Sequence, residues 1–162
     1  PNDYDAHLGL ALALRGQIDD SNFDKMVADS NAELEAAKKI APERAETYYN
    51  HGILTQEYSA KGTGKAPEPE LRKAQALYKE FVSKAGSAAE FADSVKSAND
   101  RVKEIDQIID FNKQTEAQQK ATAADAKQKE AEAEAKGENA DQNGAPPGDN
   151  KDEKKDEAPK AP

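Results

Sequence analysis

The sequence contains no cysteine and no tryptophan, and only 6% of its 162 residues are aromatic. The absence of cysteine excludes disulfide bonds, thiolate metal ligands and a cysteine nucleophile. The scarcity of aromatic residues means that many small contacts between helices must stabilise the folded part. The lack of cysteine fits reducing and oxidising compartments equally, so it does not indicate where the protein works.

The sequence also lacks a long apolar run and an excess of positive charge. It has no run of about 18 apolar residues, so no transmembrane helix is predicted. The chain carries 23 basic and 32 acidic side chains, a formal net charge of −9. Because negative charge is repelled by nucleic-acid phosphates and anionic lipids, we expect no binding to nucleic acid and no direct binding to a membrane surface.

Residues typical of catalytic, metal or cofactor sites are missing as well. No serine or threonine lies in a nucleophile-elbow motif. The two histidines, His7 and His51, have no clear third metal ligand in the pattern, so we interpret them as packed or groove-facing residues. We therefore predict no catalytic residue, no metal site and no cofactor.

What the sequence does contain is a series of helical patterns. Apolar residues recur at steps of three and four, and glycine or proline interrupts the runs, which is typical of helices that bury one face. We expect five helices, over residues 4–15, 23–41, 45–60, 70–85 and 87–111. The last would begin with a capping box formed by Ser87 and Glu90. The predicted fold class is all-α.

Composition divides the chain into three parts. Every clearly apolar residue larger than alanine lies at or before Phe111, so we expect one helical domain over residues 1–111. Residues 112–136 are mainly alanine, glutamine, lysine and glutamate, which favour a helix but offer no core, so we expect a helical extension. Residues 137–162 have the composition of a disordered tail.

Two segments of the first part repeat. Leu8-Gly9 aligns with His51-Gly52 at a spacing of 43 residues, and each pair is followed by a loop and a second helix. Glycine at such a position allows two helices to cross closely. We therefore expect Gly9 and Gly52 to lie at equivalent helix crossings.

These features resemble the tetratricopeptide-repeat (TPR) family. The run Tyr48-Tyr49-Asn50-His51-Gly52 fits the first helix of a repeat, and Ala74 with Tyr78 fits the second. The end of the preceding repeat is represented by Leu34, Ala37 and Pro42. Departures from the pattern occur at Asp5, Ser30 and His51, and both inter-helix loops are longer than a repeat of about 34 residues allows.

The resemblance implies a right-handed α-solenoid of two helix pairs, closed by a C-terminal helix. Within the family, the long loops and the segment 45–58 are similar to TPR lipoproteins of bacterial gliding-motility machinery. That likeness implies a non-enzymatic scaffold for other proteins of a cell-envelope assembly. A lipid anchor upstream of Pro1 would hold it at the periplasmic side of the outer membrane. The alternative is a soluble cytoplasmic TPR adaptor or co-chaperone that binds a peptide segment of a client.

The resemblance also implies a binding surface, because the first helix of each TPR pair lines the inner face of the solenoid. The implied partner-binding residues are His7, Tyr49, Asn50, Ile53, Gln56 and Glu57. Tyr49 can be either an aromatic anchor for the partner or a residue packed between helices, and Asn50 can pair with a bound backbone. The acidic Glu57, in a protein of net charge −9, favours a neutral to basic partner segment.

Overall fold

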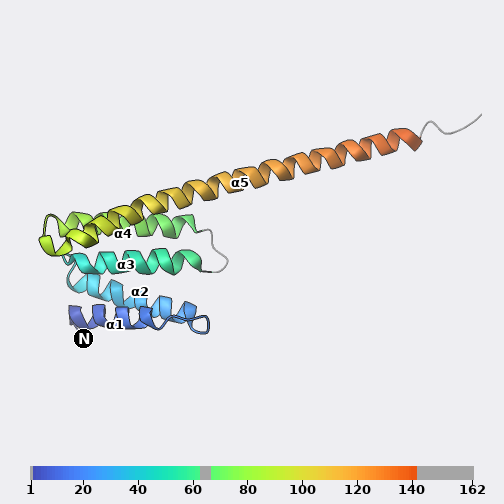
Figure 1. Ribbon diagram of the computed structural model, residues 1–162. Coiled ribbons are helices and arrows are strands. Elements are labelled where there is room, and N and C mark those ends of the chain that lie inside the picture. The colour runs from blue at the N-terminus through green and yellow to red at the C-terminus, as the bar shows by residue number, and fades with distance from the viewer. Residues whose placement is uncertain (1, 63–66, 142–162) are drawn as a thin grey trace, which may run out of the picture. The chain divides into compact units, whose positions relative to one another are not determined.

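The computed structural model describes residues 2–62 and 67–141, with side chains up to residue 133. Within these ranges every regular element is a helix (Figure 1). The elements are α1 (Tyr4–Gly16), α2 (Phe23–Ile40), α3 (Ala45–Glu57), α4 (Glu68–Ala85) and α5 (Ala92–Asp141), with 3-10 turns at Ser59–Lys61 and Ala89–Phe91. The predicted all-α class is confirmed for the described residues.

The chain divides into two compact units, Pro1–Thr115 and Glu116–Pro162. The first unit holds α1 to α4 and the part of α5 up to residue 115. The second unit holds the remainder of α5, which runs to Asp141, so residues 137–141 of the predicted tail are helical. The rest of that predicted tail, residues 142–162, lies outside the described residues.

Local chemistry explains the ends of the first helices. The Asp3 carboxylate caps α1 by accepting hydrogen bonds from the backbone amides of Asp5 and Ala6, at 3.1 and 3.2 Å. Helix α2 ends at Ile40, as predicted from the proline that follows at position 42.

The junction between α4 and α5 differs from the prediction. Gly86 ends α4 with a φ of 56°, in the left-handed region that glycine tolerates best. The capping box predicted at Ser87 is wrong. A 3-10 turn with no side-chain cap follows Gly86, and α5 begins only at Ala92.

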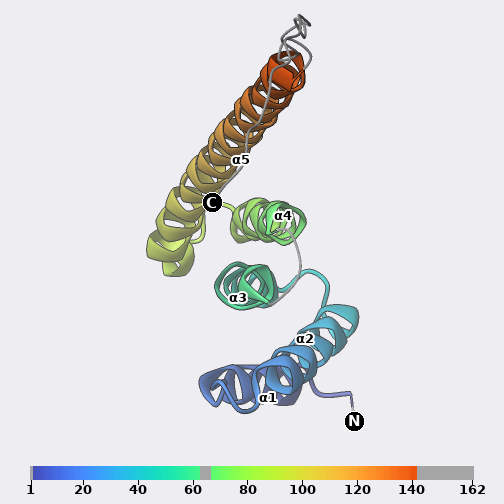
Figure 2. The same ribbon diagram turned by 90° about the vertical axis from the view of Figure 1, so that its right-hand side faces the viewer.

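In the first unit each helix packs on the next along the chain, α1 on α2, α2 on α3 and α3 on α4 (Figures 1 and 2). Helix α3 is central, because it also contacts α1 and α5. One apolar cluster joins α3, α4 and α5 around Tyr78, Phe81 and Ile105. A smaller cluster joins α1, α2 and α3 through Ala11, Leu34 and Leu54.

The two repeat glycines are not equivalent in packing, contrary to the prediction. A Cβ atom built on Gly52 would lie 2.6 Å from a ring carbon of Tyr78, whereas one built on Gly9 would meet no atom within 4 Å. The close approach of α1 to α2 occurs instead at Ala11, whose carbonyl oxygen accepts a hydrogen bond of 2.9 Å from the buried Ser30 hydroxyl. Gly9 lies two residues from Ala11, and so on a different side of α1.

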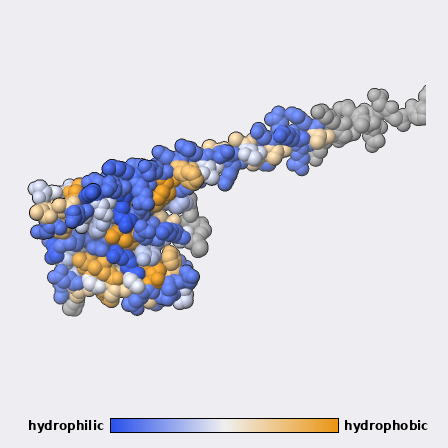
Figure 3. Space-filling view, in the orientation of Figure 1, coloured by the Kyte–Doolittle hydropathy of each residue, from blue (hydrophilic) through white to orange (hydrophobic). Residues whose placement is uncertain are grey.

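The described helix of the second unit is formed by its local sequence. Every side chain from residue 116 to 133 is exposed, and the surface of this stretch is mainly hydrophilic (Figure 3). Alanine, glutamine, lysine and glutamate are among the best helix formers, and the pairs Glu116–Lys120 and Gln128–Glu132 add small i,i+4 contributions. This stretch is therefore helical, as its composition predicts. No described helix is long and apolar enough to span a membrane.

Candidate functional site

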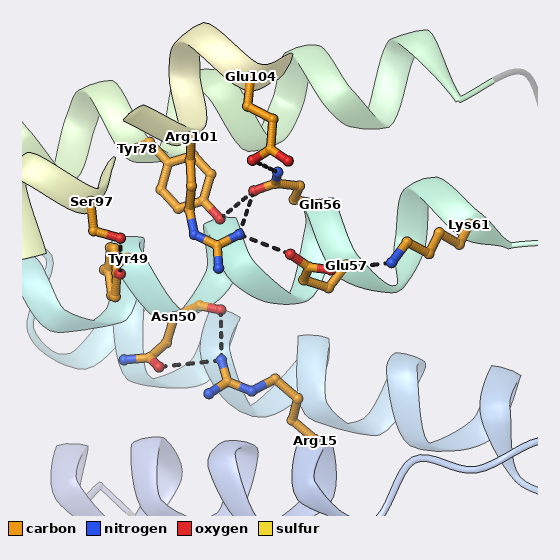
Figure 4. Close-up of polar contacts among 10 residues, drawn as sticks. All are labelled: Arg15, Tyr49, Asn50, Gln56, Glu57, Lys61, Tyr78, Ser97, Arg101 and Glu104. Atoms are coloured by element: carbon orange, nitrogen blue, oxygen red, sulfur yellow. Dashed lines mark hydrogen bonds and ion pairs between the residues drawn. The ribbon is translucent and has the colours of Figure 1, made fainter. Parts of the chain in front are cut away.

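Five of the six predicted partner-binding residues lie on α3, and three of them form a stripe along it. Asn50, Ile53 and Glu57 are spaced three and four residues apart and are half-buried. Arg15 of α1 reaches Asn50, and Arg101 of α5 reaches Glu57 (Figure 4). We call these five residues the α1–α3–α5 face. It is assembled from three helices that are distant in sequence.

A shallow hollow adjoins this face on its α5 side. The residues that line it are polar or charged, and they carry both signs of charge: Glu57, Asp93, Lys96, Ser97, Asp100, Arg101 and Glu104. Polar side chains in a depression suit the recognition of another protein surface, where hydrogen bonds and ion pairs set the orientation of the partner.

Arg15 connects α1 to this face. It belongs to the last turn of α1, where a positive side chain is favoured by the helix dipole. Its Nη1 atom donates to the backbone carbonyl and to the side-chain Oδ1 of Asn50, each at 3.3 Å. Burial lowers the pKa of Arg15, and the positive charge of Arg101 adds to that effect. The guanidinium stays protonated at neutral pH.

Gln56 is the centre of a network that holds α5 against α3. Its Oε1 accepts hydrogen bonds of 2.9 Å from the Tyr78 hydroxyl and from Nη1 of Arg101. The same Arg101 nitrogen donates to Glu57 at 2.8 Å. The hydrogen bonds from Arg101 and Lys61 lower the pKa of Glu57, so the carboxylate stays ionised well into the acid range. Burial raises the pKa of Tyr78 above its ordinary value.

We expect Arg101→Ala to destabilise the first unit by about 1–3 kcal/mol, because the buried Gln56 oxygen loses its charged donor and Glu57 keeps only Lys61. The measurement is urea unfolding followed by circular dichroism. The matched control is Lys103→Ala on the same helix, which removes only an exposed pair with Asp100 and should change stability by less than about 1 kcal/mol. Equal losses for both variants would contradict the role given to Arg101.

Tyr49 is part of the packing and not a free anchor. Its ring lies 4.9 Å from that of Phe81 and 6.0 Å from that of Tyr78, measured between centroids. Its hydroxyl donates to Ser97 Oγ of α5 at 3.0 Å. Alanine at this position would therefore weaken the core as well as any binding surface, so Tyr49 is a poor probe of partner binding.

The two histidines lie in different environments. His7 is half-buried, and its Nδ1 atom lies 2.6 Å from the Glu33 carboxylate on α2. His51 is fully buried, and its Nε2 pairs with Asn31 Oδ1 at 2.8 Å, while Nδ1 has no hydrogen-bond partner. Of the predicted site residues, His7 alone lies off α3. Within the described ranges, no group of three or more His, Cys, Asp or Glu residues is arranged to hold a metal ion.

Comparison with protein-family models, curated proteins and solved structures gives no match for this chain.

Sequence reasoning missed Arg15, Ser97 and Arg101. Nothing in the local pattern marks them, because each belongs to a polar position on an amphipathic helix, where a solvated side chain is the ordinary expectation. Their place beside α3 depends on how α1 and α5 pack, which involves contacts between residues 35 to 48 positions apart.

Proposed function

We propose that this chain is a non-enzymatic protein-interaction scaffold of the TPR kind, with its helices arranged as a right-handed α-solenoid. In this proposal it holds other proteins of a cell-envelope assembly such as a gliding-motility machinery. A lipid anchor keeps it at the periplasmic side of the outer membrane. The α1–α3–α5 face is the surface that holds the partner.

The α1–α3–α5 face is the observation that carries the proposal. The first, third and fifth helices contribute side chains to one polar surface, and in a TPR solenoid these are the helices that line the inner face. The face adjoins a hollow whose lysine, Lys96, is exposed. The likeness of residues 48–52 to a TPR first helix supports the same conclusion.

The alternative is a soluble adaptor or co-chaperone that binds a client peptide on the same face. The face does not distinguish the two functions, because the same side chains would recognise an envelope protein or a client peptide. The two functions differ in where the complex is found, so one experiment with fractionated cells separates them.

The experiment places a photoreactive amino acid at Lys96 of the full-length protein in its native cells. Illumination should join it to a specific protein, identified by mass spectrometry. Recovery of the product in the membrane fraction supports the envelope scaffold, and recovery in the soluble fraction supports the adaptor.

The control carries the same photoreactive residue at Lys79, an exposed lysine of α4 that belongs neither to the face nor to the hollow. We expect no crosslink to that protein from position 79. If both positions give the same products, or if position 96 gives none, the α1–α3–α5 face is not the binding surface.

A further inference from the structure

Arg15 differs from the other arginines of the chain. The sequence has four, all within the described ranges. Three of them pair with a glutamate: Arg44 with Glu46, Arg72 with Glu68 and Arg101 with Glu57. Among the described residues Arg15 has no carboxylate partner, and its hydrogen bonds go only to the two oxygens of Asn50.

This arrangement leaves the charge of Arg15 incompletely compensated. The side chain is half-buried, and a cation withdrawn from water needs strong acceptors to offset its lost hydration. Neutral oxygens at 3.3 Å are weaker acceptors than a carboxylate, whose charge-assisted bonds are roughly twice as strong. Only Nη1 is used, so Nε and Nη2 can still form the two parallel bonds that guanidinium makes with a carboxylate.

Arg101 supplies a second guanidinium group on this side of α3, paired there with Glu57. Figure 4 shows the guanidinium groups of Arg15 and Arg101 extending toward α3 from α1 and from α5, at neighbouring positions along it. Arg101 also uses only Nη1 for its bonds within the chain. An anion between the two groups would contact unused donors from both.

The acidic residue of the face does not oppose this charge. Glu57 is paired with Arg101 at 2.8 Å and with Lys61 at 3.1 Å. The sequence suggested a neutral to basic partner because of Glu57 and the net charge of −9, but two cations already pair with the Glu57 carboxylate. Glu57 by itself therefore does not favour a basic partner, and Arg15 is the charged residue of the face that has no oppositely charged partner among the described residues.

We propose that the α1–α3–α5 face binds an acidic segment of a protein partner, and that a carboxylate of this segment pairs with Arg15 beside Arg101. The proposal rests on the proposed function, because it names the chemistry of the partner that the same face holds. Ile53 supplies an apolar contact at the middle of the face.

The test is a fluorescence-anisotropy titration of the protein into a labelled peptide of alternating glutamate and serine. Peptides with lysine or glutamine in place of glutamate serve as comparisons. We expect binding of the glutamate peptide, weakened by added salt, and at least about tenfold weaker binding by Arg15→Gln. Arg15→Lys, which keeps the charge but not the paired donors, should fall between wild type and Arg15→Gln.

The matched control is Arg72→Gln, which removes the same charge from an exposed site on α4. It should bind the glutamate peptide like wild type. Circular dichroism melting identifies any variant that is unfolded. In addition, the Nε–H signal of Arg15 in a ¹⁵N–¹H spectrum should move when the peptide is added. An unmoved signal, equal binding of the lysine peptide, or unchanged affinity in Arg15→Gln overturns the proposal.

The crosslinking experiment at Lys96, repeated with Arg15→Gln in the full-length protein, separates this inference from the proposed function. If the partner is still captured at an undiminished level, the face binds a protein but not through a carboxylate on Arg15. If Arg15→Gln abolishes the crosslink to the partner and Arg72→Gln does not, both the proposed function and the pairing of a carboxylate with Arg15 are supported. If the wild-type protein gives no crosslink to any protein, the proposed function itself is contradicted.

Discussion

Replacing Gly52 with leucine should unfold the first unit or leave it without fixed tertiary packing. Even a methyl group at this position would lie 2.6–3.0 Å from three ring carbons of Tyr78. The ring cannot move aside easily, since Tyr78 is fully buried and its hydroxyl is held by Gln56. Overpacking of a core costs about 1–3 kcal/mol for small additions, and leucine adds several atoms more.

Gly52→Ala gives a graded version of this result. Alanine favours a helix over glycine by about 1 kcal/mol, so the clash must exceed that gain for the variant to be less stable. We expect the free energy of unfolding of Gly52→Ala to be about 1–2 kcal/mol lower than that of the wild type, measured by urea unfolding followed by circular dichroism. The matched control is Gly9→Ala. The new methyl group would meet no atom within 4 Å, so the free energy of unfolding should rise by up to about 1 kcal/mol.

A double variant tests the cause of the effect. Combining Gly52→Ala with Tyr78→Val removes the ring that the new methyl group meets. The two changes should then be less destabilising together than the sum of the single losses, because they act on one contact. Strict additivity would show that the loss at position 52 has another origin.

Acidification from pH 6.5 to pH 4 should remove about 3 kcal/mol of stability through His51 alone. Burial, the dominant cause, lowers the pKa of His51 to about 4 from 6.5. The unfolded chain therefore binds a proton in this range that the folded chain does not, so stability falls as the pH drops below 6.5. The loss is complete only below about pH 4, the pKa of the folded chain, and each unit of pKa difference corresponds to about 1.4 kcal/mol.

The charges around His51 act in both directions. Glu35 of α2, whose Oε1 lies 3.6 Å from Nδ1, favours the protonated form, whereas Lys38 of α2 and Lys73 of α4 oppose it. Desolvation is the largest effect, and the two lysines act in the same direction, so together they outweigh Glu35. At pH 7 the neutral ring is therefore the stable form in the folded chain.

The measurement is urea unfolding of the wild type and His51→Gln at several pH values. Glutamine can still donate to Asn31 but does not titrate, so the pH-dependent part of the difference between the two proteins isolates His51. The wild type should lose stability relative to the variant between pH 6.5 and 4. Because glutamates with lowered pKa values, such as Glu46 and Glu57, act below about pH 4.5, the interval from 6.5 to 5 is the cleanest. Parallel curves for the two proteins would mean that His51 is accessible to water in the folded state.

Helix number and approximate boundaries could be predicted from the sequence, because they depend on local patterns. The three- and four-residue spacing of apolar positions, the proline at position 42 and the glycine at position 86 each act within a few residues. Residues 116–133 are helical for the same reason, since their helix propensity needs no packing partner. The capping box at Ser87 was wrong because its pattern also fits a 3-10 turn, which this junction adopts.

The packing and the composition of the candidate site were decided by tertiary structure. Sequence alone put Gly9 and Gly52 in the same role, but only Gly52 faces a ring from another helix. It left open whether Tyr49 is a binding anchor or a packed residue, whereas in the structure the Tyr49 hydroxyl donates to Ser97 of α5, which lies 48 positions later in the chain. It took Glu57 as a charge that favours a neutral to basic partner, whereas Arg101 and Lys61 pair with this carboxylate in the structure. It did not identify Arg15 and Arg101. In each case the sequence by itself determined which residues share a helix face. Contacts between distant segments decide which helix faces meet, and therefore which charges are paired and which have no partner of opposite charge. No local pattern encodes these contacts.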